Sequence, residues 1–282
     1  VHTIPYEVIE IEDYDAKAYC LLRLGAPANV TVILTGNPST VLNLAVKADL
    51  WKDRLIRDIR DGTLEAGLAL SPHIRRTIEA RLEPCAAKAA ELEALASANG
   101  RLRPADYWPN LKLVHTWTNG NCALVLPKLE DWFSEGTPFL DFGYIASEIT
   151  AADLIDPATN ASLLALLSGF YEFSPVEDED KADADKRFLM AHEVDVGGRY
   201  YIYVTTFSGL YRYDMNDIVE IVGMHDRAPL LKFLFKGKGV TSIQGEKVSE
   251  TQFIEAVKRA QVKLSVRCDF FVGYANPERS VY

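Results

Sequence analysis

The stretch Gly209–Val219, with the sequence GLYRYDMNDIV, gathers two tyrosines, an arginine and two aspartates. Strand-like runs on both sides predict that it is a turn beside a core. Such a turn needs Gly, Asn or Asp for its backbone, but burying the other polar groups costs free energy unless they bind something. Asp217 is the strongest candidate, because a carboxylate in a turn accepts both hydrogens of a ribose diol. Tyr211 and Arg212 are further candidates for binding a ligand, and an Asx turn with a structural arginine is the alternative.

A second candidate group is the string YIASE at Tyr144–Glu148. It ends a predicted strand, and open α/β sheets bind ligands at the carboxyl ends of their strands. The ring of Tyr144 can stack on a heterocycle, and the hydroxyl of Ser147 can reach a phosphate oxygen. The carboxylate of Glu148 can hold Mg²⁺. Taken alone, the string also fits a buried tyrosine followed by a Ser-Glu helix cap.

A third group follows the strand-like run Leu230–Phe235. It consists of Lys236-Gly237-Lys238-Gly239 and then Gly245, Glu246 and Lys247. Glycines beside basic residues suit a hinge or a contact with phosphate, and they also suit an ordinary turn. The same segment is the best candidate for a domain boundary. We therefore predict a domain boundary between residues 1–236 and residues 237–282.

The elements that must position these groups follow from hydrophobic periodicity. Val30–Leu34 is β-branched and continuous, which predicts a buried strand. A helix is predicted to begin near Asn37, with Ser39 or Thr40 as its N-cap, and to continue through the helical apolar spacing of Val41–Ile59. This part of the chain therefore reads as a strand followed by a long helix.

Further along, Ser71–Asn99 keeps helical spacing, and Pro84 divides it into two predicted helices. The acidic run Glu177–Lys186 is predicted to be a solvated, mobile loop and not a metal site. Alternation and length predict strands at Lys112–Trp117, Phe139–Tyr144, Gly169–Phe173, Phe188–His192, Tyr200–Thr206, Ile218–Val222, Leu230–Phe235 and Phe270–Tyr274, and helices at Leu124–Phe133 and Ser249–Gln261. Interspersed strands and helices indicate an α/β chain.

The composition of the 282 residues, 48% hydrophobic and 25% charged, is that of a globular protein. The net charge of -10 argues against nonspecific nucleic-acid binding, which needs a basic face, but it leaves a small anionic ligand open. No apolar run reaches the about 18 residues of a membrane span. The four cysteines have no CxxC or Cys/His metal spacing, so we expect reduced thiols in a cytoplasmic protein.

The order of the motifs resembles one known family. The strings are YIASE at Tyr144–Glu148, YEFSP at Tyr171–Pro175, VTTFSGLYRYDMNDIV at Val204–Val219 and FKGKGVTSIQGEKVSE at Phe235–Glu250. Together they resemble the auxin-responsive Gretchen Hagen family of acyl-acid amido synthetases, within the adenylate-forming ligase superfamily. GLYRY is fairly specific, whereas the other strings are weak singly. The resemblance extends over nearly the whole chain and implies an α/β fold, with part of a large adenylate-forming domain and the start of a small carboxy-terminal α+β domain.

The resemblance implies a two-step reaction that uses ATP and Mg²⁺. ATP would activate a small carboxylic acid as an acyl-adenylate, and the amine of an amino acid would then attack it. By motif position, Tyr144 would pack near adenine and Asp217 would hold the ribose hydroxyls. Ser147 would meet phosphate and Glu148 would support Mg²⁺. Lys236 stands where related enzymes place a basic residue beside the hinge, which makes Glu148 and Lys236 the candidate catalytic residues.

The chain departs from the family pattern at two positions of the turn. The family usually has Gly where Asn216 stands and often Arg where Asp214 stands. Because Asn tolerates positive φ better than most residues, the turn is expected to survive. The added carboxylate of Asp214 would either repel ATP or face solvent. The family's Ser/Thr/Gly-rich phosphate loop is expected before Val1, so these 282 residues alone are predicted to be weakly active or inactive.

Three other interpretations stay open at this stage. An acyl-CoA ligase-like enzyme would pass the acyl group to a thiol instead of an amine. A non-catalytic nucleotide- or acid-binding domain would bind the same ligands without turnover. An unrelated α/β domain would bind neither ATP nor AMP. Pyrophosphate release, and the acceptor that discharges the adenylate, separate these interpretations.

Overall fold

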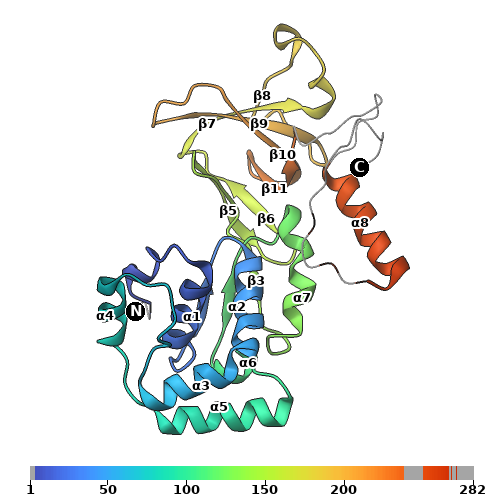
Figure 1. The fold of residues 1–282 in the computed structure, drawn as a ribbon. Helices are drawn as coiled ribbons and strands as arrows, with labels where there is room; N and C mark the ends of the chain where they lie inside the picture. The colour runs from blue at the N-terminus through green and yellow to red at the C-terminus, as the bar shows by residue number, and fades with distance from the viewer. Residues whose placement is uncertain (1–3, 238–249, 267, 269–270, 272–282) are drawn as a thin grey trace, which may run out of the picture. The chain divides into compact units, whose positions relative to one another are not determined.

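The computed structural model describes residues 4–237, 250–266, 268 and 271. The chain forms two compact units (Figure 1): the first holds Val1–Thr118 and Cys122–Leu140, and the second holds Asn119–Asn121 and Asp141–Tyr282. The domain boundary predicted at residues 236 and 237 adjoins residues outside the described ones, and it stays a prediction. Lys238, Gly239, Gly245, Glu246 and Lys247 lie outside the description, as does most of the strand predicted at Phe270–Tyr274.

The first unit consists of helices and a small parallel sheet. The strands pair in the order β1-β2-β3, at Val32–Leu34, Leu113–His115 and Phe139–Leu140. The helices before the second unit's sheet are η1 (Tyr6–Val8), α1 (Tyr14–Gly25), α2 (Pro38–Leu50), α3 (Lys52–Asp61), α4 (Pro72–Glu79), α5 (Ala86–Asn99), α6 (Pro104–Tyr107), η2 (Gly120–Leu124) and α7 (Leu126–Glu130). Helices α3 and α5 lie side by side (Figure 1), and their apolar faces join α1 in the main core of this unit.

Strand β1 forms where the sequence predicts a strand, but the expected burial is wrong. Val32 and Leu34 are 49% and 66% exposed. Among the described residues, β1 lies at the edge of its sheet and pairs with β2 alone, so one of its sides has no neighbouring strand. A continuous β-branched run therefore predicted the backbone conformation correctly but not how many faces of the sheet are covered.

The long helix predicted after this strand also needs two corrections. Its N-cap is Asn37, whose side-chain oxygen accepts from the N–H of Ser39 at 2.9 Å, with Pro38 in the first helical position. The helix then ends at Leu50 and a second one begins at Lys52, because Trp51 has non-helical dihedral angles. The division of the next region by Pro84 is confirmed, since α4 and α5 lie on either side of it.

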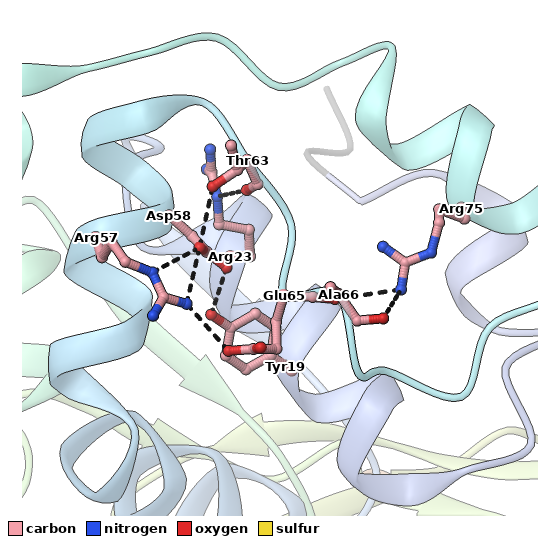
Figure 2. A network of polar contacts seen from close by, with 8 residues as sticks. All are labelled: Tyr19, Arg23, Arg57, Asp58, Thr63, Glu65, Ala66 and Arg75. Atoms are coloured by element: carbon pink, nitrogen blue, oxygen red, sulfur yellow. Dashed lines mark hydrogen bonds and ion pairs between the residues drawn. The ribbon is translucent and has the colours of Figure 1, made fainter.

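A buried carboxylate, Asp58, links α1 to α3 in the first unit (Figure 2). The hydroxyl of Tyr19 donates to Oδ2 at 2.7 Å, and the hydroxyl of Thr63 donates to Oδ1 at 3.0 Å. Arg57 Nη2 also donates to Oδ1, at 3.3 Å. Both carboxylate oxygens therefore have hydrogen-bond donors from the same unit, as expected of a structural buried charge.

Two further arginines complete this network by binding backbone carbonyls (Figure 2). Arg23, 3% exposed, donates through Nε to the carbonyl of Thr63 at 3.0 Å. Arg75 Nη2 donates to the carbonyls of Glu65, Ala66 and Leu68 at 3.1 to 3.3 Å. The segment after α3 thus has its carbonyl groups satisfied by side chains where no helix or strand can do so.

The second unit contains an eight-stranded sheet in the order β4-β5-β6-β11-β10-β9-β7-β8, and every strand pair is antiparallel. The strands are β4 (Tyr144–Ile145), β5 (Thr150–Asp156), β6 (Ala161–Leu164), β7 (Gly169–Pro175), β8 (Leu189–Met190), β9 (Arg199–Thr206), β10 (Tyr213–His225) and β11 (Ala228–Lys236). The core on this sheet is centred on residues such as Phe173, Ile202, Val219 and Leu231. Helix α8 (Glu250–Leu264) follows.

The strand predicted over Phe139–Tyr144 is in fact two strands. Phe139–Leu140 is β3 of the parallel sheet, whereas Tyr144–Ile145 is β4 of the antiparallel sheet. Gly143 makes the separation possible: its φ is +85°, and an added Cβ would lie 2.3 Å from the carbonyl oxygen of Ala152. The expectation of an open α/β sheet at YIASE is therefore wrong, because the string begins with a short antiparallel strand, Tyr144–Ile145.

The acidic run Glu177–Lys186 has local structure that the sequence did not predict. It contains two 3₁₀ turns, η3 (Val176–Asp178) and η4 (Asp183–Asp185). Asp178 is buried and accepts from Arg187 Nε at 2.7 Å, and Lys181 lies 2.7 Å from its other oxygen. These hydrogen bonds, with that of Arg187 first, hold the pKa of the Asp178 carboxyl well below its ordinary value. The run is thus anchored on one buried carboxylate.

Candidate functional site

The site is built on an irregularity of β10. Tyr213 and Asp214 pair with Val204 and Tyr203 of β9, but the next pair joins Ile218 to Tyr201. Three residues of β10, Met215 to Asp217, therefore lie opposite a single residue of β9. Such a bulge re-aims side chains, which is why bulges are common at functional sites.

Asp214 and Asn216, the two positions where the chain departs from the family pattern, both lie at this bulge. Asn216 has a φ of +54°, so the prediction that Asn can adopt the left-handed conformation is confirmed. Its N–H donates to Asp214 Oδ1 at 2.8 Å. The carboxylate of Asp214 is thus engaged in an Asx-type turn that stabilises the bulge.

The bulge places Asp217 inside the unit, where it is 2% exposed. The hydroxyl of Tyr144 donates to Asp217 Oδ2 at 2.6 Å. The ammonium of Lys236 lies 2.7 Å from Oδ1 but outside the alignment of a hydrogen bond, so among the described residues Oδ1 has a counter-ion and no aligned donor. A buried carboxylate oxygen without a hydrogen bond is unusual, and it is a free acceptor for a ligand hydroxyl.

Tyr144 is a buried hydrogen-bond donor. Its ring is 5% exposed and stacks on Phe233, with 6.1 Å between the ring centroids and 12° between the planes. Burial, then the negative charge of Asp217 and the hydrogen bond to it, raise the pKa of the Tyr144 hydroxyl far above its ordinary value. The charge of Glu148 acts on the Tyr144 pKa in the same direction. The hydroxyl stays protonated and oriented toward Asp217.

Lys236 is the last residue of β11 and lies opposite Asp217 in the strand pairing. Its ammonium donates to the carbonyl of Met215 at 3.2 Å and pairs with Asp217. The side chain is 56% exposed, so the cation contacts both the buried carboxylate and solvent. From this position the Lys236 ammonium can pair with an anionic group of a ligand while its backbone stays in β11.

Ser147 and Glu148 lie in the turn between β4 and β5, closed by a hydrogen bond from the N–H of Ala146 to the carbonyl of Ile149 at 3.0 Å. Ser147 is exposed and Glu148 is half-buried. The Ser-Glu helix cap considered from the sequence is wrong, because no helix begins here. In the described part of the chain no three His, Cys, Asp or Glu side chains form a metal cluster.

Arg212 belongs to a different cluster from Asp217. Its Nε donates to Glu172 Oε2 at 2.9 Å, and a second bond to the same carboxylate makes the pair bidentate. Its guanidinium carbon lies 4.5 Å from the ring centre of Phe188. The bond to Glu172 raises the pKa of Arg212. Tyr211, next to it, is 84% exposed.

The structure thus brings together Tyr144, Asp217 and Lys236. Among the described contacts of Arg212, none is with these residues. Sequence reasoning missed the partners Glu172 and Phe233, because nothing in the spacing joins residues 40 or more positions apart. The assembled chemistry is an acceptor for a hydroxyl beside a half-exposed cation, which suits a sugar that carries an anionic group.

Two family models match this chain. The GH3 family N-terminal domain matches residues 1–139, and the GH3 family central domain matches residues 162–236. Together they cover most of the sequence. The chain belongs to the GH3 family. The resemblance inferred from the order of the motifs is therefore confirmed, and so is the α/β fold of an adenylate-forming domain that it implied.

Curated relatives in the GH3 family are similar over almost the whole chain. An indole-3-acetic acid-amido synthetase of Arabidopsis thaliana, GH3.17, is 32% identical over 93% of this chain and 47% of its own length. A jasmonoyl-L-amino acid synthetase of Oryza sativa subsp. japonica, GH3.5, is 30% identical over 91% of this chain and 47% of its own length. The chain spans about half the length of the curated relatives it matches.

Solved structures of the GH3 family agree with this fold. The acyl acid amido synthetase GH3.15 superposes with a TM-score of 0.78 at 26% identity, over 93% of this chain and 47% of its own. A complex of that protein with 2,4-DB gives a TM-score of 0.75 at 26% identity, over 90% of this chain and 44% of its own.

Proposed function

We propose that the protein containing this chain is an ATP-dependent ligase that joins a small carboxylic acid to the amine of an amino acid. The relatives that share its family are named amido synthetases, which supports an amine as the acceptor. The observation that carries the proposal for this chain is the buried Asp217 Oδ1, which has a counter-ion but no hydrogen-bond donor in the part of the chain that the structure describes. A ribose hydroxyl is a donor of the right kind for it.

In the proposed reaction the carboxylate of the acid attacks the α-phosphorus of ATP, which gives an acyl-adenylate and pyrophosphate. The amine of the amino acid then attacks the acyl carbon, which gives an amide and AMP. Asp217 would hold the ribose through its free oxygen, while Tyr144 keeps the carboxylate oriented. Lys236 would offset negative charge that develops on the transferring phosphoryl group.

The residues of the β4–β5 turn suit the phosphates of the same substrate. Ser147 is exposed and can donate to a phosphate oxygen. Glu148 would be a protein ligand for Mg²⁺, and a single carboxylate is enough because Mg²⁺ usually completes its shell with waters and phosphate oxygens. Bound Mg²⁺ would supply charge neutralisation for the leaving pyrophosphate.

The structure narrows the roles that the sequence suggests for Tyr144, Arg212 and Tyr211. Tyr144 presents little of its ring, since it is 5% exposed and already stacks on Phe233, so we assign it to Asp217 and not to adenine. Arg212 would stabilise the turn through Glu172, and Tyr211 would contact ligand from its exposed position. A cytoplasmic location stays a prediction from the sequence. Among the described residues, no helix has the length and apolar character needed to cross a bilayer.

The test is ATP–pyrophosphate exchange by the whole protein with a panel of small carboxylic acids, followed by single-turnover discharge of the adenylate. We expect exchange with at least one acid and discharge by an amino acid, but not by coenzyme A. Discharge by coenzyme A alone would replace this proposal with an acyl-CoA ligase. Binding of ATP without any exchange would leave a non-catalytic binding domain.

A further inference from the structure

Tyr201 is a buried tyrosine that the proposed reaction does not use. It lies on β9, opposite Ser174 of β7 and Ile218 of β10, and it is 4% exposed. Its hydroxyl donates to a carboxylate oxygen of Glu179, in the acidic run. Burial, and then this hydrogen bond, raise the pKa of Tyr201. The exposed carboxylate of Glu179 therefore holds the hydroxyl end of the Tyr201 side chain, while the rest of the ring is buried.

The ring of Tyr201 lies directly against Gly237, the residue after Lys236. A Cβ added to Gly237 would be 2.0 Å from Tyr201 Cε1 and 2.7 Å from its Oη. No side chain fits in that space, since real Cβ atoms do not approach other atoms within 3.0 Å. The backbone at Gly237 is thus in van der Waals contact with the ring, and the position of the ring limits where this backbone can go.

The backbone at Gly237 is also bonded to the bulge that carries Asp217. The N–H of Gly237 donates to the carbonyl of Asn216 at 2.8 Å. Lys236, one residue earlier, reaches the carbonyl of Met215 and the carboxylate of Asp217. The ring, the glycine and the bulge therefore form one continuous set of contacts that ends at the Lys236 ammonium.

We propose that Tyr201, held by Glu179, is a positioning residue for Lys236. The Lys236 side chain is half-exposed and loses considerable rotamer freedom when it is held at Asp217. The contact of the Tyr201 ring with Gly237 fixes the backbone next to Lys236. A fixed backbone leaves the Lys236 side chain fewer conformations, so the ammonium is held near Asp217 at a lower entropic cost. The functional part of this inference rests on the proposed role of Lys236 in the reaction.

The direct test measures the Gly237 amide without any nucleotide. Hydrogen–deuterium exchange mass spectrometry, with overlapping peptides that resolve Gly237, is applied to Tyr201→Phe in the whole protein. Loss of one hydroxyl bond should accelerate exchange of this amide about fivefold. The matched control is Tyr200→Phe, on the same strand, where the lost hydroxyl accepts from the N–H of Asp195 at 3.0 Å instead. We expect less than a twofold change in the control.

Two variants of the carboxylate give a rescue comparison. Glu179→Gln keeps an oxygen that accepts from Tyr201, whereas Glu179→Ala removes it. We expect Gly237 exchange near the wild-type rate in the first and accelerated exchange in the second. Unchanged exchange in Tyr201→Phe would overturn the proposal. Equal acceleration in Tyr200→Phe would also overturn it, because the effect would then be a general loosening of the sheet.

Kinetics then separate positioning from simple destabilisation. In ATP–pyrophosphate exchange, Tyr201→Phe should lower kcat several-fold and leave KM for ATP within twofold, since Asp217 and Tyr144 are untouched. A raised KM with unchanged kcat would overturn the link to Lys236. A wild-type protein that catalyses no exchange would refute the proposed function, and the amide measurement would still decide whether Tyr201 holds Gly237.

Discussion

Each unit of this chain buries an aspartate beside a tyrosine and a cation, and the two sites differ in one respect. Asp58 in the first unit and Asp217 in the second are each 2% exposed. Each accepts from a tyrosine hydroxyl, at 2.7 Å from Tyr19 and 2.6 Å from Tyr144. Similar burial and similar partners would suggest similar roles.

The difference lies in the second carboxylate oxygen. Asp58 Oδ1 accepts from Thr63 and Arg57, so the protein itself satisfies this charge. Within residues 4–237 and the described part of the segment after them, Asp217 Oδ1 has only the nearby ammonium of Lys236, without an aligned hydrogen bond. A saturated buried carboxylate stabilises a fold, whereas an unsaturated one has capacity left for a ligand. Burial alone does not distinguish the two roles.

The largest effect is expected on stability in the first unit. Asp58→Ala leaves the buried cation Arg23 without its nearby negative charge and the Tyr19 hydroxyl without its acceptor, and should lower the free energy of unfolding by about 3–5 kcal/mol. Urea unfolding followed by circular dichroism measures it. The control is Asp53→Ala, an exposed position on the same helix, where the loss should stay below about 1 kcal/mol. A comparable loss in both variants would refute the structural role of Asp58.

The second effect is on binding. Asp217→Ala in the whole protein should weaken ATP binding by about 1–3 kcal/mol, because it removes charge-assisted hydrogen bonds. Isothermal titration calorimetry measures this loss, with Asp153→Ala on the exposed face of the same sheet as the control. Unchanged affinity in Asp217→Ala would rule out the ribose assignment.

A smaller and sharper contrast comes from the two tyrosines. Tyr19→Phe and Tyr144→Phe each remove one hydroxyl bond to a buried carboxylate, and each should cost about 1 kcal/mol of stability. Only Tyr144→Phe should also weaken ATP binding, by about threefold to tenfold. Paired melting and calorimetry experiments on the two variants check this. An equal change in ATP affinity in both would erase the distinction between the sites.

The smallest effect concerns pH, and it differs in onset between the units. Burial raises the pKa of Cys20, in the first unit, from 9.0 to about 12, and that of Tyr171, in the second, from 10.0 to about 12. A raised folded pKa means that stability is fully present below the unfolded value and is lost as pH rises through the folded value. Ionisation of Cys20 in the unfolded chain should therefore lower the free energy of unfolding by about 1 kcal/mol at pH 10. Tyr171 should lower it by as much only at a higher pH, because its unfolded pKa is higher.

Unfolding measured between pH 8 and pH 12 tests this order. Cys20→Ala should remove the early part of the loss, between about pH 9 and pH 10, and leave the later part in place. The same early loss in Cys20→Ala would show that another group is responsible.

Much of the fold follows from local sequence. The start of α2, the division at Pro84 and the long strands β9 to β11 depend on caps, proline and alternation, which act over a few residues. What local patterns miss is what lies outside the segment. They do not report that β1 is an edge strand, or that Gly143 divides a single apolar run between two sheets.

The candidate site could likewise be predicted from the sequence only in part. The order of the motifs was enough to select Tyr144, Asp217 and Lys236, which the structure places in contact. It also selected Arg212, whose bidentate pairing with Glu172 is a contact between residues 40 positions apart. A motif ties together residues close in sequence, and it does not say which of them is already paired with a distant residue.

The three residues Asn119–Asn121 have a consequence for the synthesis of this protein. They belong to the second unit, although the chain returns to the first unit at Cys122. Gly120 lies close against Phe233 and Leu234 of β11, about 110 residues further along. At ordinary elongation rates those partners leave the ribosome roughly 5–20 s later. The contact of Gly120 with β11 therefore forms only after most of the second unit has been synthesised.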